Sequence, residues 1–210
     1  IPPALLATCS FPCIDLSLAG NMNGLQGKHS SAFWGFIKIL QAQGESAPPL
    51  VLVENVPGWL SSNNGADFRV AVKALNEAGY SCDVFVLDAR CFVPQSRERV
   101  FIVGAKHRPP IVNPEALLNR PPLLTNKRLR EAIAANLDLR WTFVNIPVPP
   151  SKRKSGFNEY VEDLPEDDLR WWKEEEVQRH LEMMAVSHRL RVEEMRQMNS
   201  NSFRTFYRRV

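Results

Sequence analysis

Three short stretches of the chain carry side chains that could do chemistry together. They are Pro12 and Cys13 in "FPC", Glu54 and Asn55 in "ENV", and Gln95, Arg97 and Arg99 in "PQSRER". A cysteine thiolate is a strong nucleophile when nearby cations or N–H dipoles lower its pKa. A carboxyl group can exchange a proton with a substrate, and a guanidinium can hold a substrate oxygen.

Each stretch also has a purely structural interpretation. A free cysteine is among the most buried residue types, so a lone Cys13 is most often a packed thiol. Glu54 and Asn55 could simply end a strand, and "QSRER" could be a solvated turn. If "QSRER" is instead part of a strand, Arg97 and Arg99 point to the same face.

The elements around these stretches favour an α/β fold. Apolar runs with β-branched residues predict strands at 4–10, 49–56, 82–89 and 99–105, and helical spacing predicts helices at 31–43 and 66–79. This order is strand, helix, strand, helix, strand, strand. It predicts a largely parallel sheet whose functional loops lie at the carboxyl ends of the strands, and the three stretches fall at the ends of strands.

The pattern changes after about residue 107. Proline-rich segments alternate with a short predicted helix at 126–137, and the chain from Pro165 onward reads as helix with an interruption near Ser187. We therefore expect a catalytic domain at 1–107 and a second, smaller module at 108–210. The aromatic stretches "WTF", "RWW" and "FRTFY" are expected to pack into that module rather than to stack on bases.

Composition favours a globular protein of the cytoplasm. The chain has 210 residues, 44% of them hydrophobic, and no apolar run long enough to cross a membrane. Its four cysteines lack CxxC spacing, which indicates a reducing compartment. The net charge of +3 is mild, and the basic C-terminal end suits either a polyanion or a solvated helix.

Taken together, "FPCIDLSLAG", "LVENVPG" and "VPQSRERVFIVG" resemble the motifs of the DNA cytosine-5 methyltransferase family, in that family's order. The resemblance implies a Rossmann-like sheet of the S-adenosylmethionine-dependent kind, followed by a smaller, irregular and helical target-recognition module at 108–210. The implied reaction transfers a methyl group from S-adenosylmethionine to carbon 5 of a cytosine rotated out of double-stranded DNA. Relatives of this kind occur in restriction–modification systems and as orphan methylases of bacteria and phages.

The resemblance also implies a role for each residue. Cys13 would add to carbon 6 of the ring, and Glu54 would contact N3 and the exocyclic amine. Arg99 would hold O2, while Arg97 and Gln95 would organise the pocket. Pro12, Ser17 and Asn55 would help to bind the substrate, with Asn55 orienting the loops. The glycine-rich segment 17–28 would close over the base.

The sequence departs from this family in two places. The glycine-rich cofactor motif does not precede Ile1, and the family's closing motifs do not follow the recognition region. We therefore expect an internal fragment, monomeric, that binds the cofactor poorly and is inactive alone; its cofactor-binding residues are left unassigned. The stretch "DARCFVPQ" also lacks a glycine that many relatives have, which makes the aim of Arg97 less certain.

Three alternatives stay open at this point. The chain could belong to an RNA (tRNA) cytosine-5 methyltransferase of the same fold. It could be a non-catalytic nucleic-acid-binding relic that uses "SKRKS" and the basic C-terminal stretch to contact phosphates. Least favoured is a redox or metal pair formed by Cys9 and Cys13, because no second His or Cys pair lies at ligand spacing.

Overall fold

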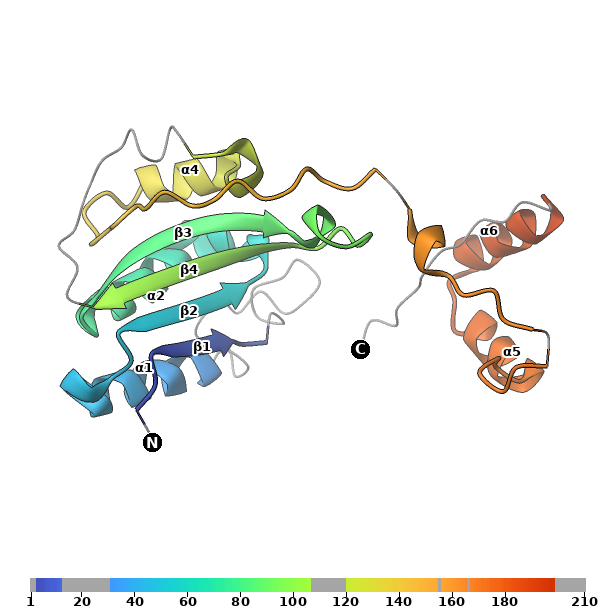
Figure 1. Ribbon diagram of the computed structural model, residues 1–210, viewed down its shortest axis with the longest axis horizontal. Helices are drawn as coiled ribbons and strands as arrows, with labels where there is room; N and C mark the ends of the chain where they lie inside the picture. The colour runs from blue at the N-terminus through green and yellow to red at the C-terminus, as the bar shows by residue number, and fades with distance from the viewer. Residues whose placement is uncertain (1–2, 13–30, 107–119, 155, 166, 199–210) are drawn as a thin grey trace. The chain divides into compact units, whose positions relative to one another are not determined.

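A single mixed sheet organises the first part of the chain. The computed structural model describes residues 3–12, 31–106, 120–154, 156–165 and 167–198. In these residues four strands form a sheet in the order β1-β2-β4-β3 (Figure 1). The strands are β1 (Leu6–Ser10), β2 (Leu50–Asn55), β3 (Tyr80–Asp88) and β4 (Glu98–Lys106).

The expectation of a largely parallel sheet is wrong for β4. Strand β1 pairs parallel with β2, but β4 lies between β2 and β3 and runs antiparallel to both. The reason is the short connection at 89–97, which cannot hold the crossover that a parallel partner of β3 would need. The chain instead reverses after Asp88, and Glu98 pairs opposite it. The first residues of β4 therefore lie beside the last residues of β2.

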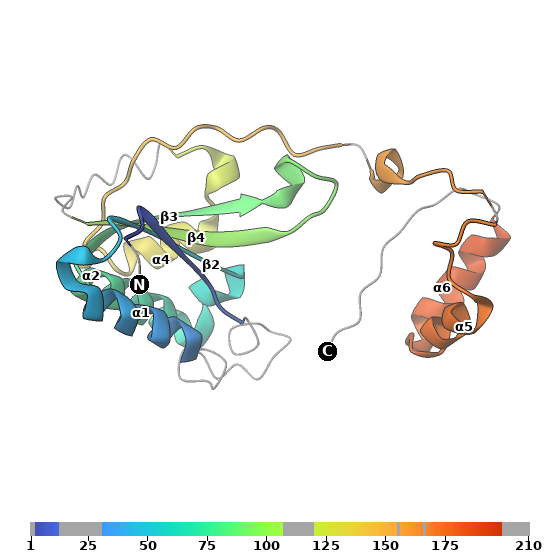
Figure 2. The same cartoon turned by 60° about the horizontal axis from the view of Figure 1, so that its bottom comes forward.

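Helices α1 (Ser31–Gln43) and α2 (Ala66–Glu77) lie on one face of the sheet (Figures 1 and 2). Both were expected from their apolar spacing, and the predicted alternation of strands and helices is confirmed. Their buried side chains join those of the sheet in one hydrophobic core. This core includes Phe11, whose ring meets Trp59 edge-on with centroids 5.5 Å apart. Because Phe11 is only 4% exposed, packing fixes the chain immediately before Pro12.

The segment after residue 119 packs against β3. Helix α4 (Lys127–Ala134) buries Leu129 and Ile133 in the core. Trp141 is fully buried beside β3, where Cys82 donates its backbone N–H to the Arg140 carbonyl at 3.0 Å. Trp141 of "WTF" is thus packed as expected, but against β3 and Phe68 of α2 rather than within a separate second module. By its contacts the chain divides into two compact units, Ile1–Arg153 and Lys154–Val210, while the functional division at 107/108 stays a prediction.

The second unit is helical but exposes its apolar side chains. Its helices are the short 3-10 turn η9 (Phe157–Tyr160), α5 (Glu174–Glu182) and α6 (Val186–Gln197), and neither α5 nor α6 has a buried residue in the part described. Trp171 and Trp172 are 54% and 50% exposed, so the packing expected of "RWW" is only partial. Trp172 stacks on His180 with ring centroids 4.2 Å apart, and Trp171 donates its indole N–H to the Pro165 carbonyl at 2.8 Å. The stretch "FRTFY" lies outside the described residues.

The helix expected from Pro165 begins only at Glu174. Asp168 accepts the backbone N–H of Arg170 at 2.9 Å and the Arg170 guanidinium, which favours a turn over a helix. The three glutamates of the first turn of α5 then suit a helix N-terminus. The expected interruption is confirmed, but it falls at Met183–Ala185 rather than at Ser187. Among the described residues no helix is long and apolar enough to span a membrane.

Candidate active site

The candidate site lies where β1 and β2 end and β4 begins. Ser10 closes β1 opposite Glu54 of β2, and Asn55 pairs with Val100 of β4. Since β4 runs antiparallel to β2, Arg99 starts beside the end of β2. The reversed strand therefore brings the "ENV" and "QSRER" stretches together.

The Glu54 carboxylate is bound at both of its oxygens. Arg99 Nε lies 2.9 Å from Oε1, and Ser10 Oγ donates to Oε2 at 2.5 Å. The side chains of Arg99 and Glu54 are 18% and 24% exposed, so the ion pair is half-buried. A further guanidinium nitrogen of Arg99 donates to the Glu98 carbonyl at 2.7 Å. These contacts hold a carboxylate and a cation side by side and within reach of a ligand.

Asn55 ties the end of β2 to the chain that leads into "FPC". Its buried side-chain amide donates to the Phe11 carbonyl at 3.1 Å, and its oxygen accepts the Val56 backbone N–H at 2.8 Å. These bonds are what a loop-orienting residue needs. Pro12 is exposed, whereas Cys13 and Ser17 lie outside the described residues.

Gln95 and Arg97 occupy the loop before β4. Both side chains are exposed, and Arg97 precedes the first residue of the strand. The direction of the Arg97 side chain is therefore not set by the alternation of side chains along a strand. The expectation that Arg97 and Arg99 point to the same face held only if both lay on a strand, and Arg97 does not. Among the described residues no hydrogen bond or ion pair joins the Arg97 side chain to Glu54.

The loop that carries Gln95 and Arg97 is anchored by Asp88. This carboxylate accepts the backbone N–H groups of Arg90 and Arg97 at 3.0 and 2.8 Å. Burial alone would raise the pKa of Asp88, but the hydrogen bonds from Arg90, Lys152 and Arg97 hold it at about 2. Asp88 is thus a carboxylate at neutral pH.

Ser10 and Asp88 were missed by the sequence reasoning. Each is a polar residue at the end of an apolar run, which is also the position of Glu54. That signal was used for the "ENV" stretch and was available for both.

The described cysteines are poor nucleophiles. Burial raises the pKa of Cys9 to about 11 and that of Cys82 to about 12, and Cys91 is buried as well. A protonated Cys9 does not suit the redox or metal pair considered above. Within the described ranges no group of three His, Cys, Asp or Glu side chains could hold a metal ion.

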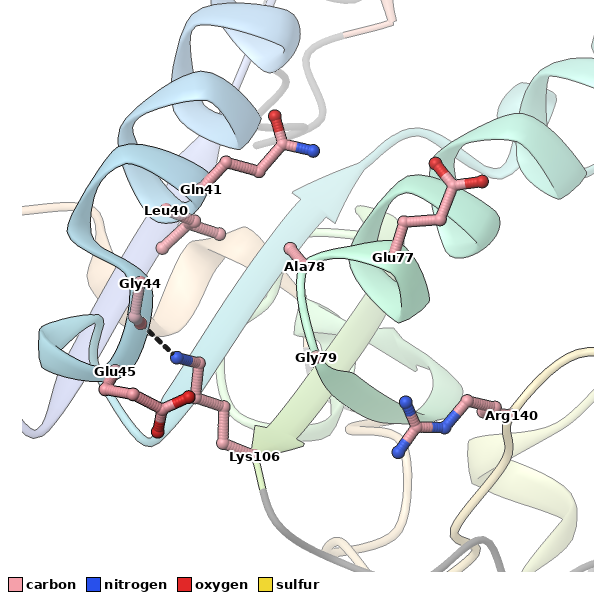
Figure 3. Close-up of a pocket in the computed structure, with 9 residues that line it drawn as sticks. All are labelled: Leu40, Gln41, Gly44, Glu45, Glu77, Ala78, Gly79, Lys106 and Arg140. Atoms are coloured by element: carbon pink, nitrogen blue, oxygen red, sulfur yellow. Dashed lines mark hydrogen bonds between the residues drawn. The ribbon is translucent and has the colours of Figure 1, made fainter.

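A surface hollow lies at the other end of the sheet (Figure 3). Lys106, the last residue of β4, donates from Nζ to the Gly44 carbonyl, and Arg140, Glu45 and Glu77 also line the hollow. Arg99 stands at the opposite end of the same strand. The hollow is therefore separate from the candidate site.

Comparison with known proteins places the chain in a family. Residues 4–209 match the model for C-5 cytosine-specific DNA methylases. Because this match covers nearly the whole sequence, the chain belongs to the C-5 cytosine-specific DNA methylase family. The resemblance inferred from the three motifs is thereby confirmed.

Curated relatives are bacterial and phage methyltransferases. The Type II methyltransferase M.Sau3AI of Staphylococcus aureus is 41% identical over 46% of this chain and 24% of its own length. M2.BsuMI of Bacillus subtilis is 34% identical over 52% of this chain and 29% of its own. The orphan methyltransferase M.SPRI of Bacillus phage SPR is 29% identical over 78% of this chain and 37% of its own. The chain thus spans between a quarter and two fifths of these relatives.

Similar solved structures are also methyltransferases. EhMeth of Entamoeba histolytica aligns with a TM-score of 0.41 and 15% identity, over 50% of this chain and 32% of its own. Dnmt2 of S. pombe aligns with a TM-score of 0.35 and 24% identity, over 50% of this chain and 29% of its own.

Proposed function

We propose that the protein is a DNA cytosine-5 methyltransferase that acts on a cytosine rotated out of double-stranded DNA. The observation that carries the proposal is the Glu54 carboxylate held between Arg99 and Ser10, beside the chain that Asn55 fixes just before Cys13. Family membership supplies the reaction class.

The roles follow from the chemistry of the ring. Carbon 5 of cytosine is too electron-poor to attack a methyl group, so the Cys13 thiolate adds to carbon 6 and forms a sulfur–carbon bond. The electron pair of the carbon 5–carbon 6 double bond is then available at carbon 5. Glu54 accepts the exocyclic amine when ionised and donates to N3 when protonated. Arg99 holds O2, where negative charge collects.

After methylation the adduct must break down. Water takes the proton from carbon 5, and the electron pair left behind restores the carbon 5–carbon 6 double bond and expels the Cys13 thiolate. Gln95 and Arg97, presented on the loop that Asp88 anchors, organise the pocket around the base. Pro12 and Ser17 complete the substrate site.

S-adenosylmethionine supplies the methyl group when it is bound. The side chains gathered at Glu54 are a carboxylate, a hydroxyl and a guanidinium, a set that suits the polar edge of a base. They do not form a site for this cofactor, so its binding falls to other residues.

Contacts with DNA fall to basic side chains outside this site. Arg189, Arg191 and Arg196 are exposed on α6, where they can meet phosphates. The enzyme would act as a monomer in the cytoplasm of a bacterial cell, and it could be encoded by the bacterium or by a phage.

Expression of the full open reading frame in a host without cytosine methylation tests the proposal. We expect 5-methylcytosine in the host DNA by mass spectrometry, none with Cys13→Ser, and at least a roughly hundredfold lower rate with Glu54→Gln. Glu45→Gln, at the far hollow, is the matched control and should methylate like the wild type. Equal methylation by Cys13→Ser would overturn the mechanism. Methylated tRNA with unmethylated DNA would establish the RNA alternative, and no product in either would favour the non-catalytic relic.

A further inference from the structure

Asp88 collects more hydrogen bonds than a strand end requires. It is the last residue of β3 and is 4% exposed. Besides the amides of Arg90 and Arg97, its carboxylate accepts Lys152 Nζ at 2.9 Å and Ser96 Oγ at 3.3 Å. The four donors come from both ends of the loop 89–97 and from a segment distant in sequence.

The same loop is bound along its backbone. Ala89 donates its N–H to the Arg97 carbonyl at 3.1 Å, which closes the loop at its base. Arg153 donates its N–H to the Arg90 carbonyl at 2.9 Å, and Arg90 Nε donates to the Arg153 carbonyl at 3.0 Å. Arg153, the last residue of the first unit, is therefore bound to the loop at two points, and its neighbour Lys152 is bound to Asp88.

We propose that Asp88 is a positioning residue for the methyl transfer. Its carboxylate holds the loop that bears Gln95 and Arg97 at the start of β4, and it fastens that loop to the segment leading into the second unit. The proposal rests on the function proposed above. It gives Asp88 a role through Arg97 and none in direct contact with the base.

Asp88 binds all four donors only in its ionised form. A carboxylate has acceptor sites for all four donors, whereas an asparagine amide would turn an NH₂ group toward at least one of them. We call these four bonds the clamp: Oδ1 accepts the amides of Arg90 and Arg97, and Oδ2 accepts Lys152 and Ser96. Asp88→Asn keeps the shape of the side chain but weakens the clamp, because an NH₂ group replaces Oδ2 opposite the Lys152 ammonium and the bonds at Oδ1 lose their charge. Small displacements of a site residue can cost about a hundredfold in rate.

Asp83 provides a matched control on the same strand. It is equally buried at 4% and accepts the backbone N–H groups of Val84 and Val144, together with the Arg120 guanidinium. Its partners lie away from the loop 89–97. Asp83→Asn therefore measures the loss of a buried carboxylate without loss of the clamp.

Hydrogen exchange of the full 210-residue chain tests the clamp independently of catalysis. With Asp88→Asn we expect the amides of 89–97 to exchange at least about tenfold faster, with α1 unchanged. With Asp83→Asn the same loop should keep its protection, and exchange should increase near Val144. Unchanged exchange in the loop of Asp88→Asn would overturn the proposal.

Steady-state kinetics of the protein encoded by the full open reading frame test the role of Asp88 in methyl transfer. We expect Asp88→Asn to lower kcat at least about tenfold while KM for S-adenosylmethionine stays within about twofold. Asp83→Asn should keep the wild-type kcat per folded molecule. Equal losses of kcat in both variants would reduce Asp88 to a stabilising residue. If the wild type itself does not methylate, the proposed function and the catalytic role both fail, whereas the exchange experiment still decides whether Asp88 clamps the loop.

Discussion

Two buried aspartates of β3 sit in surroundings that differ in kind. Asp83 and Asp88 are both 4% exposed, yet burial raises the pKa of Asp83, whereas that of Asp88 is held at about 2. The Arg120 side chain that pairs with Asp83 is 2% exposed, and the Lys152 side chain that pairs with Asp88 is 42% exposed. Around Asp83 the loss of water therefore outweighs its partners, and around Asp88 the partners outweigh it.

The difference separates a residue that holds the fold from one that holds the site. Asp83 joins β3 to Arg120 and Val144, which packs the later segment onto the sheet. Asp88 joins β3 to the loop that presents Arg97. Equal exposure thus says little about role, and the partners of each carboxylate decide it.

Removal of the Arg120 charge should give the largest effect on stability. Arg120→Met leaves Asp83 as a buried carboxylate without its cation, which costs about 3–5 kcal/mol of unfolding free energy. In a chain of this size that corresponds to a fall in Tm of about 6–20 °C, measurable by circular dichroism. Lys152→Met, the matched change at Asp88, should cost about 1 kcal/mol or less, because its cation is half exposed. Equal falls in Tm would remove the distinction between the two aspartates.

Removal of the uncharged Asn55 side chain should have an intermediate effect on the free energy of unfolding. Asn55→Ala removes the donor to the Phe11 carbonyl and the acceptor of the Val56 N–H, and both groups are left in a largely buried place. We expect a loss of about 1–3 kcal/mol, measured by urea denaturation. Ser61→Ala, which loses one 3.4 Å bond at an exposed position, is the control and should change stability by about 0.5 kcal/mol at most. A loss no larger than that of the control would mean that Asn55 does not fix the chain before Pro12.

The order of elements could be predicted from sequence, but the direction of β4 was not. Apolar runs and helical spacing identify strands and helices, yet an apolar run such as "VFIVG" carries no information on its direction. The length of the connection at 89–97 was the available signal, because it suits a hairpin and excludes a crossover.

The site residues that lie in the three motifs could be predicted from the sequence, and the partners of those outside the motifs could not. Glu54 and Arg99 were expected together and are found paired. Ser10 and Asp88 could have been singled out as polar residues at strand ends, but their partners could not, since these depend on strand register and on a residue as distant as Lys152. The start of α5 was missed for a similar reason. The Asp168 side chain bonds the Arg170 backbone and so favours a turn over a helix, and helical spacing of apolar residues does not reveal such a bond.

The smallest effect, and the sharpest test of the comparison, is the response to acid. Asp88 has a folded pKa of about 2, below the ordinary value of about 3.9. Its contribution to stability is therefore complete above the unfolded pKa and is lost as the pH falls toward 2. Asp83 has a raised pKa, so its contribution is complete below the unfolded pKa and is lost as the pH rises through the folded value.

The unfolding free energy changes with pH at acid pH, and we call this dependence the acid slope. Asp88→Asn and Asp83→Asn should change the acid slope in opposite directions. Between pH 5 and about pH 2.5, the unfolding free energy of Asp88→Asn should fall less steeply than that of the wild type, and that of Asp83→Asn more steeply. The difference for Asp88 should be on the order of 1 kcal/mol, because water screens its half-exposed partner. Urea midpoints at several pH values measure these slopes. A steeper acid slope in Asp88→Asn would mean that its hydrogen bonds do not stabilise the ionised form, and the clamp on the Arg97 loop would then have to depend on the backbone bonds of Ala89 and Arg153 alone.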